Sequence, residues 1–132
     1  MQKYLRDFTF NSGAQDEVIV QAETELSFRL PPEYVSFLKL CDGGEGFIGG
    51  SYVILWKIEE LCSMKDAYEV EKYAPGLLIF GSDGGGEAYG FDTRHPGSQI
   101  VQVPFIGMNW KVARLIATSF EDFLEHLNSQ GL

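Results

Sequence analysis

Apolar residues recur at helical spacing in four stretches of the chain, and each stretch predicts a helix that buries one face. Two stretches are strict, with apolar side chains at i, i+3, i+4 and i+7: Tyr34, Phe37, Leu38 and Cys41 in one, and Phe120, Phe123, Leu124 and Leu127 in the other. Two are less regular: residues 16–26, where Val18, Ala22 and Leu26 share a face, and residues 57–73, where Leu61, Met64 and Tyr68 do.

The residues that flank these stretches are typical of helix ends. Pro31 and Pro32 suit the start of the second helix, because an N–H in the first turn would have no partner there. Asp42-Gly43-Gly44 suits its end, since glycine adopts left-handed backbone angles without a Cβ penalty. Ser119 is a candidate N-cap for the last helix, with Asp122 three residues later as a weak variant of the capping box.

Short apolar runs between the helices predict β-strands over residues 52–56, 77–80, 87–92 and 100–103, with 111–117 as a candidate edge strand. A glycine loop at 81–86 joins two of them, and residues 43–50 are expected to form a flexible, partly apolar loop. Because hairpins join most strands, the predicted class is α+β: a central, mostly antiparallel or mixed sheet of four to six strands flanked by about four helices. The length indicates a single domain over residues 1–132.

Charge narrows the range of partners. Nineteen acidic and ten basic residues give a net charge of −9, which repels phosphate, so we expect a basic protein partner and no nucleic acid. No apolar run approaches the ~18 residues of a membrane span, and none follows Lys3, Arg6 and Asp7 as in a signal peptide. We therefore expect no membrane association, a cytoplasmic location, and Cys41 and Cys62 as reduced, buried thiols.

Residues that could carry catalysis or hold a metal are present, but not in a working pattern. His95 and His126 are the only histidines, and they are interpreted as surface residues. Asp83, Glu87 and Asp92 surround three glycines without the alternating oxygen ligands of a calcium loop. There is no Gly-x-Ser-x-Gly elbow and no cysteine beside a histidine. The sequence therefore favours a protein with no enzyme activity, no metal and no cofactor.

Five segments, in this order along the chain, resemble the SUKH superfamily, whose founding members are fungal regulators of cell-wall synthesis. The segments are Glu23 with Leu26; Leu30-Pro31-x-x-Tyr34-x-x-Phe37-Leu38; Asp42-Gly43-Gly44; Phe80-Gly81-x-Asp83-Gly84-Gly85-Gly86-Glu87-x-Tyr89-x-Phe91-Asp92; and Ser119-Phe120-x-x-Phe123-Leu124. Two positions depart from the superfamily's pattern. Asp42 stands where asparagine is usual, and Ser27 stands where many members carry glycine.

The resemblance implies a sheet flanked by helices, no catalytic residues and a protein partner. Many bacterial members neutralise toxins by binding them, whereas fungal members act as regulatory scaffolds. We therefore expect a bacterial immunity protein that blocks a toxin, such as a nuclease. A regulatory interaction module or a small-molecule-binding domain remains an alternative.

Two sets of residues are expected to matter. Partner contacts are predicted at acidic and aromatic positions of the loops and nearby strands: Asp42, Glu45, Phe47, Tyr52, Asp83 and Glu87. A structural role is predicted for the remaining motif residues: Leu30, Pro31, Tyr34, Phe37, Leu38, Gly43, Gly44, Gly84, Gly85, Gly86 and Asp92. The run of three glycines in particular suggests backbone angles that other residues reach only at a cost.

Overall fold

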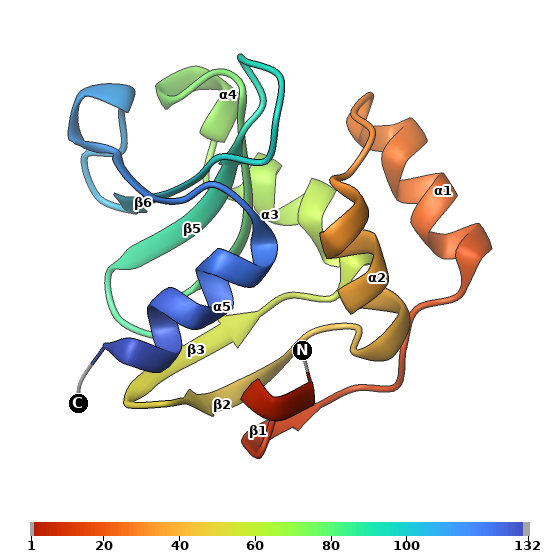
Figure 1. Cartoon of the computed structure of the whole chain (residues 1–132). Coiled ribbons are helices and arrows are strands. Elements are labelled where there is room, and N and C mark those ends of the chain that lie inside the picture. Colours follow the sequence, from red (N-terminus) through yellow and green to blue (C-terminus); the bar gives the residue numbers. More distant parts are fainter. Residues whose placement is uncertain (1, 131–132) are drawn as a thin grey trace.

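Seven strands form one antiparallel sheet in which neighbours along the chain lie side by side, in the order β1 to β7. Figure 1 shows β1, β2 and β3 next to one another. The computed structural model describes residues 2–130. The strands are β1 (Asp7–Phe10), β2 (Gly44–Ile48), β3 (Ser51–Leu55), β4 (Leu77–Ser82), β5 (Glu87–Asp92), β6 (Ile100–Pro104) and β7 (Arg114–Ala117). The α-helices are α1 (Asp16–Leu26), α2 (Pro32–Leu40), α3 (Leu61–Ala67), α4 (Val70–Tyr73) and α5 (Phe120–Ser129). Short 3₁₀ helices are η1 (Gln2–Tyr4), η2 (Ile58–Glu60) and η3 (Trp110–Val112).

The predicted α+β class is confirmed, but the sheet has seven strands, one more than the upper end of the expected range. Residues 43–50 were expected to be a loop, and this expectation was wrong, because they contain β2, which pairs with β1 and β3. The glycines that hide its β character allow the neighbouring backbone to approach. A Cβ on Gly46 would lie 2.6 Å from the carbonyl oxygen of Asp7 on β1.

The helix expected over residues 57–73 is divided into η2, α3 and α4, which gives five α-helices within the described residues where about four were expected. The division falls at Glu69, whose φ of 52° is left-handed and unusual for a residue with a side chain. This turn lets Val70 at the start of α4 become fully buried. The apolar spacing of the segment was therefore recognised correctly as helical, but the interruption was not.

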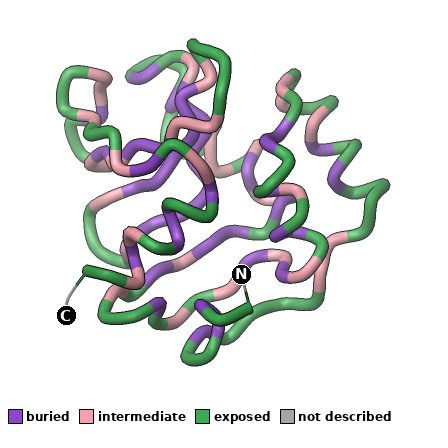
Figure 2. The backbone as a smooth tube through the Cα atoms, in the orientation of Figure 1, coloured by how far each residue is buried: buried purple, intermediate pink, exposed green. Residues whose placement is uncertain are grey.

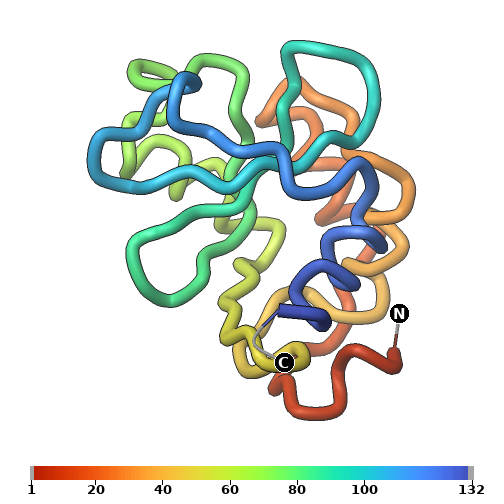
Figure 3. The backbone as a smooth tube through the Cα atoms, turned by 60° about the vertical axis from the view of Figure 1, so that its left-hand side comes forward, coloured from red at the N-terminus to blue at the C-terminus, as the bar shows by residue number. Residues whose placement is uncertain are grey.

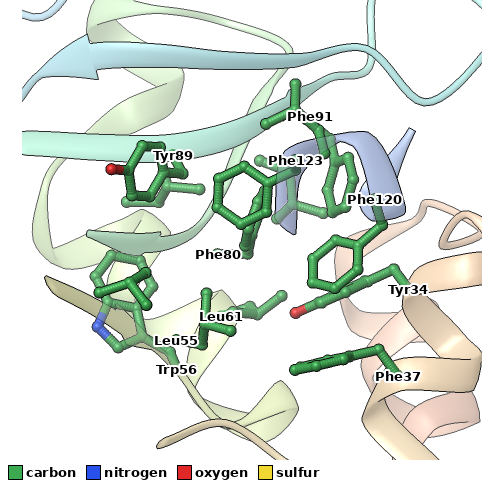
Figure 4. Packing of buried hydrophobic residues seen from close by; sticks show 14 of the residues in the cluster. Tyr34, Phe37, Leu55, Trp56, Leu61, Phe80, Tyr89, Phe91, Phe120 and Phe123 are labelled. Carbon is green, nitrogen blue, oxygen red and sulfur yellow. The ribbon is translucent and has the colours of Figure 1, made fainter. Parts of the chain in front are cut away.

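The core lies between the sheet and the helices α2 and α5, which lie next to each other on one side of the sheet (Figure 3). Both strict apolar stripes predicted from the sequence are buried there. Aromatic rings from α2, β4, β5 and α5 meet at its centre, with centroids 5.1 Å apart for Tyr34 and Phe120 and 4.7 Å for Phe80 and Phe91 (Figure 4). Such ring pairs add specific geometry to the large apolar area they bury.

Helix α1 lies at the outside of the molecule, beyond α2 and α3 (Figure 1). Exposed residues dominate its outer surface, whereas the central strands are almost wholly buried (Figure 2). Ile19 and Ala22 are the buried residues of α1, Leu26 is half-buried, and Val18 is 36% exposed. The face expected from Val18, Ala22 and Leu26 is thus only partly covered, because α1 packs mainly onto η2 and α3.

The buried end of β5 is held by an ion pair. Asp92 is 6% exposed, and its Oδ1 accepts hydrogen bonds from the backbone N–H and the Nε of Arg94, each at 3.0 Å. Nη2 of Arg94 donates to the other carboxylate oxygen at 3.1 Å. These hydrogen bonds from Arg94 lower the pKa of Asp92. The guanidinium also lies 3.5 Å from the ring centroid of Trp110, so one arginine ties β5 to η3.

Candidate partner-binding surface

The β2–β3 hairpin presents two side chains of each strand on the face that points away from α5. Glu45 pairs with Ile54 and Phe47 with Tyr52 across the two strands, so these four residues share a face. The alternate residue Ser51 points to the other side, where its hydroxyl donates to the carbonyl of Leu127 on α5 at 2.8 Å. The hairpin face therefore points mostly away from the helix that covers the core, although Tyr52 at its edge also lines a cleft with His126 and Leu127 of α5.

Two exposed aromatic rings and one carboxylate form the centre of the hairpin face. Phe47 is 49% exposed and Tyr52 is 36% exposed, and their ring centroids lie 5.3 Å apart in an edge-on arrangement. The Tyr52 hydroxyl donates a hydrogen bond to the Glu45 carboxylate, which raises the pKa of Tyr52. The contacts orient both rings and keep a negative charge beside them, an arrangement suited to a protein interface.

The glycine loop between β4 and β5 lies against this face. Gly84 has a φ of +79°, and a Cβ there would lie 2.9 Å from Cδ2 of Tyr52. Asp83 holds the loop, because its Oδ1 accepts hydrogen bonds from the N–H groups of Gly85 at 2.8 Å and Glu87 at 3.1 Å. The predicted requirement for glycine applies to Gly84 in this loop.

The other two loop glycines have a different setting. Neither Gly85 nor Gly86 is among the glycines with positive φ in residues 2–130. A Cβ on Gly86 would meet no atom within 4 Å, and one on Gly85 would meet only the Asp83 carboxylate at ordinary contact distance. The local backbone and packing therefore place no demand for glycine at these two positions.

Beyond the loop, the hairpin face continues into an apolar cleft of about 330 Å³. No charged side chain in the described part of the chain lines it; the lining residues are Ile54, Trp56, Met64, Tyr68, Ser82, Gly84, Gly85, Gly86, Phe105 and Ile106. Tyr68, the residue after α3, and Phe105, just after β6, pack with ring centroids 4.5 Å apart, and Ile106 is 93% exposed. We call the hairpin face (Glu45, Phe47, Tyr52, Ile54) together with this cleft the aromatic surface.

Sequence reasoning named Glu45, Phe47 and Tyr52, but it missed the half of the aromatic surface that comes from Tyr68, Phe105 and Ile106. The signal available for two of them was the run Phe105-Ile106-Gly107, in which large apolar side chains continue past the end of a strand into a turn. For Tyr68 the sequence pattern was misleading, because its helical spacing from Leu61 and Met64 suggested a position in the core. Its exposure follows from the end of α3 at Ala67.

Asp83 and Glu87 lie at the loop but border a second, polar cleft on the α5 side of the sheet. Asp83 lines this cleft together with Tyr89, Arg114 and His126, and Glu87 accepts a hydrogen bond of 3.5 Å from Gln102, which also lines it. Burial first, and then the charges of Asp83 and Glu87, raise the pKa of Tyr89 to about 12. His126, expected at the surface, is half-buried here, whereas His95 is exposed as expected.

Asp42 lies just before β2, at the open end of the hairpin, whereas Phe47 and Tyr52 lie next to its turn. Asp42 is half-buried, and its Oδ1 accepts a hydrogen bond of 2.8 Å from the backbone N–H of Ile58 at the start of η2. Burial raises the pKa of this carboxyl group, although the hydrogen bond from Ile58 opposes the shift. Of the six residues predicted to contact a partner, the structure thus gathers Glu45, Phe47 and Tyr52, places Asp83 and Glu87 nearby, and separates Asp42.

Groups suited to other functions are not gathered in the part of the chain that the structure describes. Within residues 2–130, no cluster of three or more His, Cys, Asp or Glu side chains could hold a metal ion. Nor does any helix in that range have the length and apolar character needed to cross a membrane. Both cysteines are free; Cys41 is buried as expected, but Cys62 is only half-buried because it borders a groove beside α1.

A family model described as the SMI1/KNR4 family (SUKH-1) matches residues 13–126. The chain belongs to the SMI1/KNR4 family. The match runs from the turn before α1 into α5, so it includes all the segments on which the SUKH resemblance was based, and only η1 and β1 lie wholly outside it. A search of curated proteins finds none that matches.

Membership of the SMI1/KNR4 family indicates which general kind of function to expect. The family is generally non-enzymatic, and its members generally act through protein–protein contacts. Two positions that depart from the superfamily's pattern also acquire a physical meaning. Ser27 has a φ of 53° at the C-cap of α1, a backbone conformation for which glycine is better suited. Asp42 carries its charge into a half-buried site where an asparagine could accept the same hydrogen bond.

Proposed function

We propose that this SMI1/KNR4-family protein is a bacterial immunity protein that neutralises a basic toxin, such as a nuclease, by binding it directly without catalysis. The observation that carries the proposal is the exposed pair Phe47 and Tyr52, held beside Glu45 on a chain with a net charge of −9. Aromatic residues at the centre of an interface supply most of its binding energy. Complementary charge accelerates the encounter and excludes partners of the wrong sign.

The acidic character suits a nuclease for a physical reason. A nuclease that binds phosphate presents basic side chains, and an acidic protein can occupy that basic surface in place of nucleic acid. The uncharged cleft beside the hairpin offers apolar contacts that slow dissociation once the complex has formed. In this account charge sets the association rate, and the aromatic surface sets the lifetime of the complex.

Co-expression tests the proposal. Genes that flank the one for this chain would be expressed singly and together with it, and growth would be followed. The expected result is that one flanking product arrests growth alone, that this chain relieves the arrest, and that the two proteins copurify. If the chain forms stable complexes with non-toxic proteins and relieves no arrest, the regulatory role of the fungal members gains support instead.

Relief of the growth arrest should depend on binding between the two proteins and not on a change in the expression of the toxic one. Phe47→Ala combined with Tyr52→Ala should abolish both the relief of arrest and the copurification, since it removes both exposed rings of the hairpin face. Phe10→Ala is the matched control. Phe10 is 46% exposed on the neighbouring strand β1, but it pairs with Gly44 and so points to the opposite face of the sheet from Phe47.

A further inference from the structure

A second apolar hollow lies between α1 and the η2–α3 segment. Its volume is about 290 Å³, and its lining residues come from these elements alone: Glu17, Val18, Gln21, Ala22, Glu25, Leu26, Ile58, Glu59 and Cys62. None of these residues lines the apolar cleft of the aromatic surface. We call this hollow the α1 groove; it is a site separate from the one on which the proposed function rests.

The floor of the α1 groove is apolar because α1 is incompletely covered. Ile19 and Ala22 pack toward the neighbouring elements, whereas Val18 remains 36% exposed and Leu26 half-buried. Ile58 is buried below them, and Cys62 closes the floor from α3. Apolar side chains in a groove between two helical segments are suited to receive large apolar side chains from a third helix.

The rim of the α1 groove is acidic. Glu17 and Glu25 of α1 and Glu59 of η2 line it, and no lysine or arginine among residues 2–130 does. None of the three forms an ion pair within residues 2–130; Gln21, between the two α1 glutamates, donates a hydrogen bond to Glu25 at 3.1 Å. Glu25 follows Glu17 by eight positions of α1, a rise of ~12 Å along the helix and hence along the groove.

We propose that the α1 groove binds an amphipathic, basic helix of a protein partner. The apolar side chains of that helix would enter between Val18, Leu26 and Cys62, and its lysine or arginine side chains would pair with the rim glutamates. Charge complementarity selects this occupant, since an acidic or uncharged helix would leave the glutamates unpaired. The spacing of Glu17 and Glu25 matches basic residues two turns apart on a helix that lies along α1.

The probe is an 18-residue peptide of leucine and lysine whose leucines repeat at i, i+3, i+4 and i+7. Two control peptides accompany it: one of the same composition with the apolar face scrambled, and one with glutamate in place of lysine. Binding is measured by fluorescence anisotropy, and its location by the rate at which N-ethylmaleimide modifies Cys62, read as intact mass. Cys41 is 0% exposed and provides the internal control for native folding.

The expected result is saturable binding of the lysine peptide that slows modification of Cys62 about tenfold or more, while both control peptides leave the rate unchanged. Replacing the rim charges by Glu17→Gln, Glu25→Gln and Glu59→Gln should weaken binding about tenfold, because three charge contacts are removed together. The matched control is Asp66→Asn, Glu69→Gln and Glu121→Gln, which makes the same change in net charge at exposed positions outside the groove. It should change the affinity less than twofold.

Four results would overturn the proposal: no binding of the lysine peptide, binding that leaves Cys62 equally reactive, equal protection by a control peptide, or equal loss of affinity in both triple variants. The outcome is independent of the proposed function. Phe47→Ala with Tyr52→Ala should leave peptide binding unchanged, and the rim variant should still relieve growth arrest if the toxin uses the aromatic surface alone. Failure of one account can therefore be distinguished from failure of the other.

Discussion

At the scale of single residues, two side chains occupy positions for which another residue is physically better suited. Asp42 holds the start of η2 through the N–H of Ile58 while it carries a charge into a half-buried site. Ser27 adopts left-handed backbone angles at the end of α1. Both departures from the superfamily's pattern were visible in the sequence. Their physical consequences became clear only from the backbone angles of Ser27 and the hydrogen-bond partner of Asp42.

Asp42→Asn should raise the stability of the protein at neutral pH. Asparagine keeps a side-chain oxygen for the N–H of Ile58 but removes the charge that burial disfavours. Because burial raises the folded-state pKa of Asp42 above its unfolded value, wild-type protein gains stability as pH falls and the carboxyl group takes up a proton. The advantage of the variant should therefore be largest near pH 7 and shrink toward pH 4. Urea unfolding across this pH range measures it, and an advantage that does not depend on pH would contradict the account.

Ser27→Gly should stabilise the protein by roughly 0.5–1 kcal/mol. The change removes the cost of left-handed backbone angles for a residue with a Cβ, and the extra conformational entropy of glycine in the unfolded chain offsets part of this gain. The control is Ser36→Gly in the exposed interior of α2, which should instead destabilise by up to about 1 kcal/mol. Thermal unfolding of both variants gives the comparison. If Ser27→Gly and Ser36→Gly both stabilised or both destabilised the protein, the left-handed backbone at Ser27 would not explain the effect of Ser27→Gly.

At the scale of elements, hydrophobic spacing predicted α2 and α5 because each buries one regular face. Continuous apolar runs predicted β4 and β5, because both faces of these central strands are buried. The pattern of apolar residues failed for β2, whose strand character comes from pairing with β1 and not from its Gly-Glu-Gly-Phe-Ile sequence. It also failed at Glu69, since nothing in the residue type indicates a left-handed turn between α3 and α4. In both places contacts between segments override local preference.

The glycine loop gives a prediction at this scale. Gly84→Val should destabilise by more than ~1 kcal/mol, because it combines a left-handed φ with a contact against the Tyr52 ring. Gly86→Ala should change stability by less than ~0.5 kcal/mol, since its Cβ meets open space. Chemical denaturation of each variant measures both effects. A large loss of stability in Gly86→Ala would show that this position is structurally constrained after all.

If Gly86→Ala is stable, its effect on partner binding becomes informative. Gly86 lines the apolar cleft without a structural need for glycine, so a larger side chain there, as in Gly86→Val, would obstruct the cleft. We expect Gly86→Val to weaken the complex with the neutralised toxin while thermal stability remains near that of wild type. Unchanged affinity would exclude this cleft from the interface and confine contacts to the β2–β3 hairpin.

At the scale of the whole molecule, the net charge and the family resemblance were both available from the sequence. The position of the binding surface was not, because it is assembled from α3, the hairpin and the segment after β6, which are far apart along the chain. Glu45, Phe47 and Tyr52 were found by residue type, and their alignment on one face depends on a strand that the sequence did not reveal.

Charge at this scale predicts the kinetics of association. If the partner is basic, the association rate should fall as salt rises, because charges are screened beyond ~8 Å at physiological ionic strength. The dissociation rate should change much less, since it depends on buried apolar contacts. Stopped-flow measurements over a salt series separate the two rates. An association rate indifferent to salt would remove the electrostatic part of the account.

The central claim is that the aromatic surface binds the protein that this chain neutralises. The dissociation constant of that complex, compared among wild type, Phe47→Ala with Tyr52→Ala, and Phe10→Ala, tests it most directly. Loss of two central aromatic contacts should raise the dissociation constant at least about thirtyfold, as expected for ~2 kcal/mol of binding energy, while Phe10→Ala should remain within about twofold of wild type. A complex that tolerates loss of both rings, or that is weakened equally by Phe10→Ala, would place the binding site elsewhere on the molecule.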